Sequence, residues 1–421
     1  MPERRRPWIV YGGACVVAAV AGCGTSGASP PATTADAAEA GTDADFGRPS
    51  STYPAFVPSG PQVVAGGGPV MKSARVVPLF YPDDPHQPAL VDFVAKLAAS
   101  PYWSDEVGEY GAGPLSIATP IVLPAAAPAS ITDADIRAML RAGLEGGTWG
   151  ASDAAIRETS VFVLHLPSST KVSDAAGGAS CSDFLGYHES VKSDAGSIIY
   201  VVLPECDPEP DQSYTAVLGH ELVEAATDPY PSAAPAFLHV ADAHLEWELA
   251  LYGGEIADLC ARFADSYFTP PDLGFRIQRA WSNRAMSGFH DPCVPAASGP
   301  YFASVPRFDE DLAIDFDGRR VIAKGIALRV GESKTVDVEL LSDAPTEGAW
   351  EVAASDAFPK LPAGTPSVAL EFDRTRGVNG EKVHLTITAT STNPSGGTVV
   401  DVTSSLGGVR RHWYGGVKLD P

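Results

Sequence analysis

The sequence predicts two folded domains of different class: a mixed α/β domain over residues 69–297 and an all-β domain over residues 298–421. Three observations lead to this prediction. Apolar runs alternate with helical patterns in the first region, and short strands of alternating polarity fill the second. The chain has 421 residues and is 45% hydrophobic, which is enough for two separate cores.

The α/β prediction rests on strands and helices that alternate along the chain. Apolar runs over residues 74–80, 160–166 and 197–203 are typical of buried strands. Apolar residues at helical steps predict a helix over residues 90–99, and Thr132 is placed to cap another that runs to about residue 143. This order indicates a sheet covered by helices.

The all-β prediction rests on short alternating runs, such as residues 335–340 and 382–388, separated by Gly, Pro and Asn. Asn379-Gly380 is typical of a tight hairpin turn. Trp350 would fill the space between two sheets. These features together predict an immunoglobulin-like sandwich.

The first 68 residues are expected to lie outside both domains. Residues 1–23 combine three arginines with a short apolar run, as in a signal peptide. They end in Val20-Ala21-Gly22-Cys23, a sequence typical of a bacterial lipobox, in which Cys23 receives the lipid; ordinary secretion with another cleavage site is the alternative. Residues 24–68, rich in small and polar side chains, are predicted to form a disordered tether.

This leader predicts a lipid-anchored protein of the bacterial cell envelope, facing outward or into the periplasm. The membrane would then be a partner through the anchor. The formal charge of the chain is −23, and such a surface repels phosphate backbones, so we expect no nucleic-acid partner. Solubility alone would also account for this acidity.

Cysteine usage agrees with export. Four cysteines fall in the folded region and allow three pairings. Proximity in sequence favours disulfides between Cys181 and Cys206 and between Cys260 and Cys293. A thiolate metal site is the alternative, but the sequence contains no C-x-x-C pair.

The strongest functional signal is His220-Glu221-Leu222-Val223-Glu224. Apolar residues at three- and four-residue steps predict a helix over about residues 213–227. His220 and Glu224 would project from one face of this helix and could hold one metal ion, with Glu221 aimed at a water bound to it. A solvated helix face on which His220 only pairs with Glu224 is the alternative.

A metal site of this kind needs a third ligand from elsewhere in the chain. Glu255 and Asp258 are the candidates. We expect Glu255 to bind the ion and Asp258 to orient a metal-bound histidine, although the opposite assignment and simple capping of a short helix stay open. Glu224 stands where the H-E-x-x-H motif has its second histidine, and a carboxylate suits calcium as well as zinc.

These blocks resemble a known family, the secreted domain related to plant phosphate-induced and EXORDIUM proteins and to bacterial secreted relatives. The resemblance covers roughly residues 70–295 and runs through Cys181, Gly186-Tyr187-His188, Pro204-Glu205-Cys206, residues 220–229, residues 255–260 and Trp281-Ser282-Asn283 before Cys293.

The resemblance implies a zincin-like domain and an extracellular role, since plant members are discussed as growth-related extracellular proteins. It carries no established substrate. His188 is a further site candidate, although a histidine beside an aromatic residue is more often held by hydrogen bonds in the core.

Two functions from different classes follow. The first is a zinc-dependent, peptidase-like hydrolase in which His220, Glu224 and Glu255 hold the ion, Glu221 is the general base and Asp258 orients the site. The second is a non-catalytic extracellular binding, adhesion or signalling module with a structural or degenerate metal site, for which calcium is an alternative.

The presence of Glu221 favours the hydrolase, because a purely structural site does not need that carboxylate. An extracellular protein, peptide or carbohydrate is the expected ligand in either case.

Overall fold

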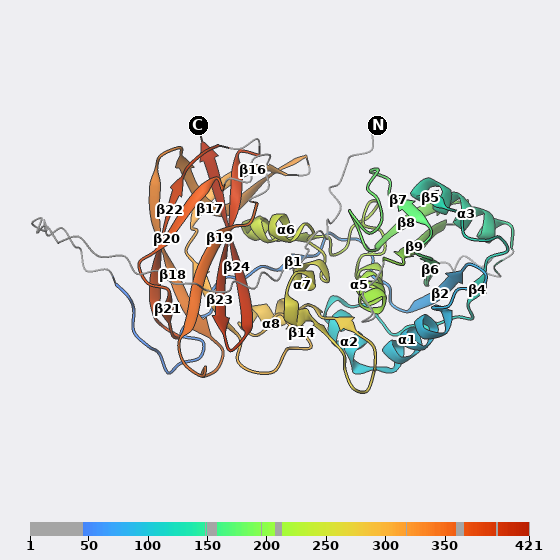
Figure 1. Cartoon of the computed structure of the whole chain (residues 1–421), viewed down its shortest axis with the longest axis horizontal. Coiled ribbons are helices and arrows are strands. Elements are labelled where there is room, and N and C mark those ends of the chain that lie inside the picture. Colours follow the sequence, from blue (N-terminus) through green and yellow to red (C-terminus); the bar gives the residue numbers. More distant parts are fainter. Residues whose placement is uncertain are drawn as a thin grey trace, which may run out of the picture.

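The computed structural model describes residues 45–147, 149, 158–194, 196–206, 213–316, 318–358, 366–392 and 395–420. The predicted signal peptide, its Cys23 and the tether up to residue 44 lie outside these residues. Within the described part of the chain, no helix has both the length and the apolar content needed to cross a membrane. Figure 1 shows a helix-covered sheet and a β-sandwich, with α6, α7 and α8 between them.

A mostly parallel sheet forms the centre of the first domain. Its strands lie in the order β3-β2-β6-β9-β8, with β4 also paired to β2, and only β8 runs antiparallel to its neighbour. The bounds are β2 Ala74–Phe80, β3 Leu115–Ile117, β4 Ile121–Val122, β6 Ser160–Leu166, β8 Tyr187–Ser193 and β9 Gly196–Pro204. The three predicted strands are therefore confirmed as β2, β6 and β9.

Helices cover both faces of this sheet. On one face, Phe93 of α1 (Gln87–Ala99) and Leu218 of α5 (Ser213–Thr227) belong to one core with inward residues of the strands. On the other face, α3 (Asp133–Glu145) contributes Ile136 and Leu140 to a second core. Strands buried on both faces are apolar almost throughout, which is why they were recognisable in the sequence. Three elements continue this domain: α2 Pro101–Val107, η1 Gly108–Tyr110 and the two-stranded pair β5 Ser130–Thr132 with β7 Lys171–Ser173.

The structure confirms the predicted starts of helices α3 and α5. Thr132 caps α3 and forms a capping box with Asp135, which binds back to the Thr132 backbone. Helix α5 has the predicted bounds, from Ser213 to Thr227.

Short elements connect the sheet domain to the sandwich. They pack mainly through the first core, which extends to this region. Their bounds are β1 Val63–Val64, β10 His239–Val240, η2 Asp242–His244, α6 Leu245–Leu251, α7 Asp258–Ala261, η3 Ala264–Ser266, β11 Tyr267–Phe268, β12 Ile277–Gln278, β13 Ala280–Trp281, α8 Asn283–Ser287 and β14 Cys293–Val294.

The second domain is the predicted β-sandwich. A four-stranded sheet, β15-β18-β22-β20, faces a six-stranded sheet, β16-β17-β24-β23-β19-β21, across one apolar core. Trp350 is fully buried in that core and donates its indole N–H to Ser304 Oγ at 3.1 Å. The bounds are β15 Phe302–Pro306, β16 Glu310–Phe316, β17 Arg319–Arg329, β18 Ser333–Ser342, β19 Trp350–Asp356, β20 Val368–Phe372, β21 Arg376–Gly377, β22 Lys382–Ala389, β23 Gly397–Leu406 and β24 Val409–Asp420.

Asn379-Gly380 does not form the predicted hairpin. The strand before it, β21, pairs with β19, whereas the strand after it, β22, pairs with β18 in the opposite sheet. The turn therefore passes the chain between sheets, and Gly380 takes a positive φ of 91° there. The Asn379 side chain accepts a hydrogen bond from Ala55 N and donates to Thr52 O.

The predicted tether ends earlier than residue 68. Residues from about 45 onward are held against the folded domains: Asn379 binds the backbone near residue 52, and Val63, 3% exposed, pairs with Val240. The bonds are mostly backbone to backbone or to a distant side chain. Composition therefore gave no sign of this order, because the few apolar residues here are anchored by partners far away in sequence.

Both predicted disulfides are confirmed. Cys181 is bonded to Cys206, and Cys260 is bonded to Cys293. The second bond fastens α7 to β14, so it supports the segment that carries Asp258.

Aromatic packing and a buried cation join the two domains. The Trp247 ring, from α6, lies 5.5 Å from the Trp281 ring and 5.0 Å from the Tyr414 ring of the sandwich. Arg411 of β24 pairs with Asp291 at 2.9 Å and also with Asp265. The junction thus belongs to the first core, which extends to Trp413 and Tyr414 of the sandwich.

Replacing Trp247 by alanine should lower the free energy of unfolding by about 3–5 kcal/mol, because it removes a large, fully buried ring that touches both domains. Chemical denaturation of the purified protein measures this loss. Tyr252→Ala, which removes a ring that is 41% exposed, is the control and should cost less than about 1 kcal/mol. An equal effect of both variants would contradict this role of Trp247.

Glu106 of α2 makes a pH-dependent contribution to stability. Burial raises the pKa of its carboxyl group well above the ordinary value, and the charge on Arg279 offsets only part of this. The folded state therefore keeps a proton that the unfolded state loses above about pH 4.5, so stability falls as the pH rises through that range, by up to about 1.4 kcal/mol per pH unit.

Glu106→Gln cannot ionise and should remove this loss. Its melting temperature, relative to that of the wild type, should increase between pH 4.5 and pH 8. The exposed Glu351→Gln serves as control and should show no such trend. A constant difference across this pH range for Glu106→Gln would exclude the buried proton.

Candidate metal centre

Helix α5 carries three of the predicted site residues on its buried side. His220 is 8% exposed, Glu221 6% and Glu224 3%. The helix packs against β8 and β9 of the sheet and against β12, and Glu224 accepts a hydrogen bond from the start of α7, so its polar side chains face protein rather than water. The solvated-face alternative is therefore excluded, and these charges need partners inside the protein.

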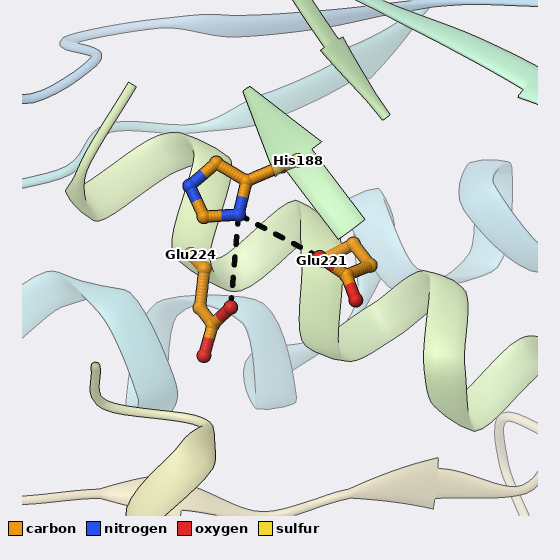
Figure 2. A group of neighbouring side chains, drawn as sticks. All are labelled: His188, Glu221 and Glu224. Carbon is orange, nitrogen blue, oxygen red and sulfur yellow. Dashed lines mark ion pairs between the residues drawn. The ribbon is translucent and has the colours of Figure 1, made fainter. Parts of the chain in front are cut away.

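His188 joins the site from strand β8. Its Nδ1 lies 3.6 Å from Glu221 Oε2 and 3.7 Å from Glu224 Oε2, as Figure 2 shows. Its Nε2 lies 3.2 Å from the carbonyl oxygen of Asp228. The core hydrogen bond expected for His188 is present, but the other ring nitrogen faces the two glutamates.

Asp258, at the start of α7, meets the other end of the cluster. Its Oδ1 lies 3.6 Å from His220 Nε2, and its backbone N–H donates to Glu224 Oε1 at 3.2 Å. His220 Nε2 lies 3.2 Å from the same Glu224 Oε1.

Glu255 lies elsewhere in the cluster. Its Oε1 is 3.5 Å from His188 Nε2. Of the two carboxylates left open by the sequence, the structure therefore brings Asp258, not Glu255, together with His220 and Glu224.

These contacts form two compact sets of ligand atoms that share Glu224. In each set, one atom from every residue lies within 4.8 Å of the others. The first set is His188, Glu221 and Glu224; the second is His220, Glu224 and Asp258. A metal ion about 2.0–2.2 Å from each ligand atom would fit within either spacing.

Hydrogen bonds outside the sets orient both imidazoles. Gln278 of β12 donates its Nε2 to Ala257 O at 2.7 Å, which turns its Oε1 toward His220 Nδ1 at 3.2 Å. His220 Nδ1 therefore carries a proton, and Nε2 faces Glu224. The Asp228 carbonyl has the same effect on His188 Nε2. The sequence gave no signal for Gln278, because its role depends on the arrival of β12 beside α5.

Charge couples the site residues strongly. Burial by itself lowers the pKa of His188, but a hydrogen bond to Glu221 and the charges on Glu224 and Glu221 outweigh this and raise the pKa to about 9. The same competition, with Glu224 as the main partner, raises the pKa of His220 well above its ordinary value.

The carboxylates respond in opposite directions. Burial and the charge on Glu224 raise the pKa of both Glu255 and Asp258 well above the ordinary range. Burial also opposes the ionisation of Glu224, but the charge on His220 outweighs burial and lowers the pKa of Glu224. Glu224 is thus the ionised carboxylate with which both histidines and the Asp258 backbone N–H pair.

The site also fits a cation. Asp258 Oδ1 and Glu255 Oε1 are buried and make no hydrogen bond, although each faces an imidazole nitrogen at 3.5–3.6 Å. Such buried oxygens are costly without a proton or a metal ion near them. Two imidazoles and several carboxylates form a donor set that zinc accepts.

Two glycines allow the close approach of site elements. A Cβ atom on Gly186, just before β8, would lie 2.7 Å from Val217 Cγ1 and 3.0 Å from Glu221 Oε1. A Cβ atom on Gly253 would lie 1.8 Å from Asp258 Oδ2. A side chain at position 186, shortly before His188, or at position 253, shortly before Asp258, would therefore collide with residues of the site.

Comparison with known proteins adds no functional assignment. No protein-family model matches the chain, and no curated protein matches it. Among solved structures, domains 4 and 5 of the S-layer protein SbsC show 11% identity over 28% of this chain and 54% of that structure, with a TM-score of 0.18. The titin M3 domain shows 9% identity over 29% of this chain and 97% of that domain, with a TM-score of 0.17.

The chain thus spans about half of the S-layer fragment. Structural similarity at these TM-scores does not establish a shared fold or function. The description of the second domain as a β-sandwich rests on its own strand pairing.

Proposed function

We propose that this protein is a zinc-dependent hydrolase of the bacterial cell envelope, acting on peptides. The observation that carries the proposal is the buried set of His220, Glu224 and Asp258, in which Asp258 Oδ1 has no hydrogen-bond partner and faces His220 Nε2 at 3.6 Å. Zinc would be held by these three side chains, with Asp258 in the place first expected for Glu255.

When bound, zinc lowers the pKa of a coordinated water and polarises a carbonyl group. Glu221 lies beside the ligands on the same helix and is the residue that accepts the proton of the water. His188 Nδ1, 3.6 Å from Glu221 Oε2, stabilises the negative charge of the Glu221 carboxylate before that carboxylate accepts the proton. Gln278 keeps the His220 imidazole in the tautomer that leaves Nε2 free to bind.

Two further features support the proposal. The helix that carries the motif packs on a sheet, as expected for a zincin-like domain resembling the EXORDIUM and phosphate-induced family. The two disulfides suit an oxidising compartment, in agreement with lipidation at Cys23 and an anchor in the envelope membrane. The sandwich would hold the site near an extracellular protein, peptide or carbohydrate.

Burial favours one second candidate. Every residue of the two ligand sets is at most 8% exposed, and closed coordination shells are typical of structural ions. The protein would then be a non-catalytic extracellular module, with a zinc or calcium ion that fixes α5, α7 and β8 together.

The proposal predicts that the purified full-length protein, solubilised in detergent, contains at least one zinc ion per chain. Glu224→Ala and Asp258→Ala should lose the ion of the His220 set, because each removes one of its three ligands. Elemental mass spectrometry measures the content. Glu246→Gln, which changes another buried glutamate outside the site, is the control and should keep the zinc. A folded wild type without metal would overturn the proposal.

The same protein should hydrolyse members of a fluorogenic peptide library. Glu221→Gln should keep the ion of the His220 set but lower the rate by about 10²–10⁴-fold, because it removes the proton acceptor. Zinc bound in the wild type without any hydrolysis, in a library covering all residue types on both sides of the cleaved bond, would favour the structural candidate.

A further inference from the structure

We propose that the Glu224 carboxylate bridges two metal ions, one in each ligand set. This inference rests on the proposed function, since it extends the zinc site of His220. The second ion would be bound by His188 and by one carboxylate oxygen of Glu221, residues that a single ion at His220 leaves unliganded, and the other oxygen of Glu221 would still accept the proton of the water. The ligand class is a pair of divalent first-row cations, such as zinc, cobalt or manganese.

The two oxygens of Glu224 face different partners. Oε1 lies 3.2 Å from His220 Nε2, whereas Oε2 lies 3.7 Å from His188 Nδ1. Each oxygen is therefore the centre of its own donor set, with Asp258 completing one and Glu221 the other. A carboxylate in this position can hold ions about 3.5–4 Å apart, the spacing of two-metal sites.

Each imidazole has one ring nitrogen engaged outside the ligand sets and directs the other at this carboxylate. A backbone carbonyl can only accept a hydrogen bond, so His188 Nε2 donates to Asp228 O at 3.2 Å, and Nδ1 is the nitrogen that faces Glu224. Gln278 Oε1 accepts from His220 Nδ1, and Nε2 is the nitrogen that faces Glu224. A metal ion can take the place of a proton between each of these nitrogens and Glu224.

One ion does not satisfy both histidines. In the described part of the chain, no group of three or more ligand atoms within 4.8 Å of one another contains both His188 and His220. An ion placed in one set therefore leaves the other imidazole facing Glu224 without a cation.

Charge balance favours the second ion. Five carboxylates converge here, and four of them, those of Glu221, Glu224, Asp228 and Asp258, are at most 6% exposed, while the Glu255 side chain is 13% exposed. When these carboxylates are ionised, one divalent ion with neutral histidines offsets two negative charges, and two ions offset four. Buried anions need such compensation because the protein interior screens charge weakly.

The first test is the metal content of the detergent-purified full-length protein after equilibration with excess zinc and gel filtration. Two zinc ions per chain are expected. One zinc per chain would overturn the bridge but leave the proposed zinc site standing. A metal-free chain would overturn both, so the two failures are distinguishable.

Variants then assign the ions. His188→Gln and His220→Gln should each lower the content from about two ions to about one, because each removes the nitrogen ligand of one set. His239→Gln is the matched control: this histidine pairs with Glu248 at 2.8 Å, away from the site, and its loss should leave two ions bound. Circular dichroism checks that the variants fold. Two ions retained in a folded His188→Gln protein would contradict the assignment.

Cobalt substitution tests the bridge itself. Two Co²⁺ ions joined by one carboxylate are magnetically coupled, so the electron paramagnetic resonance signal of the wild type should be weak for its cobalt content. His188→Gln should restore the full signal of one isolated ion. An uncoupled signal from two ions in the wild type would overturn the bridging role of Glu224.

Discussion

The burial of the Glu224 carboxylate is the constraint on which the site depends. This side chain is 3% exposed, and its charge is balanced within hydrogen-bonding or ion-pair distance by an imidazole on either side and by the Asp258 amide. Removing a buried charge from its partners costs several kcal/mol. Strand β8 and helices α5 and α7, which supply those partners, must therefore keep fixed positions relative to one another.

That requirement links the site to the rest of the fold. Strand β8 is the antiparallel edge of an otherwise parallel sheet, and it brings His188 against the C-terminal half of α5. The segment that carries Asp258 is held by the disulfide between Cys260 and Cys293. Trp281 of β13 packs on Trp247, and the Trp247 ring also contacts the Tyr414 ring of the sandwich. The sandwich thus packs against the short connecting elements, and these elements hold the segment that carries Asp258 in place.

The sequence indicated the helix and its motif because local rules govern both. Amphipathic spacing fixed the bounds of α5, and the i, i+4 relation placed His220 and Glu224 together. The sequence could not decide whether Glu255 or Asp258 is the third ligand, since both lie in one short segment whose direction is set by α7 and its disulfide. It offered His188 only as a further candidate and gave no signal for Gln278, because both residues reach the site through pairing and packing between distant elements.

The same division holds across the chain. Sequence by itself determined the buried strands β2, β6 and β9, the capping of α3 and the Trp350 core of the sandwich, because each follows from short-range pattern or composition. For the four cysteines it favoured, through proximity alone, the pairing that the structure confirms. Tertiary structure alone decided that Asn379-Gly380 crosses between sheets and that residues from about 45 to 68 are held in place. It also decided that two histidines flank one glutamate. These outcomes depend on contacts between segments far apart in the chain, which local propensity does not encode.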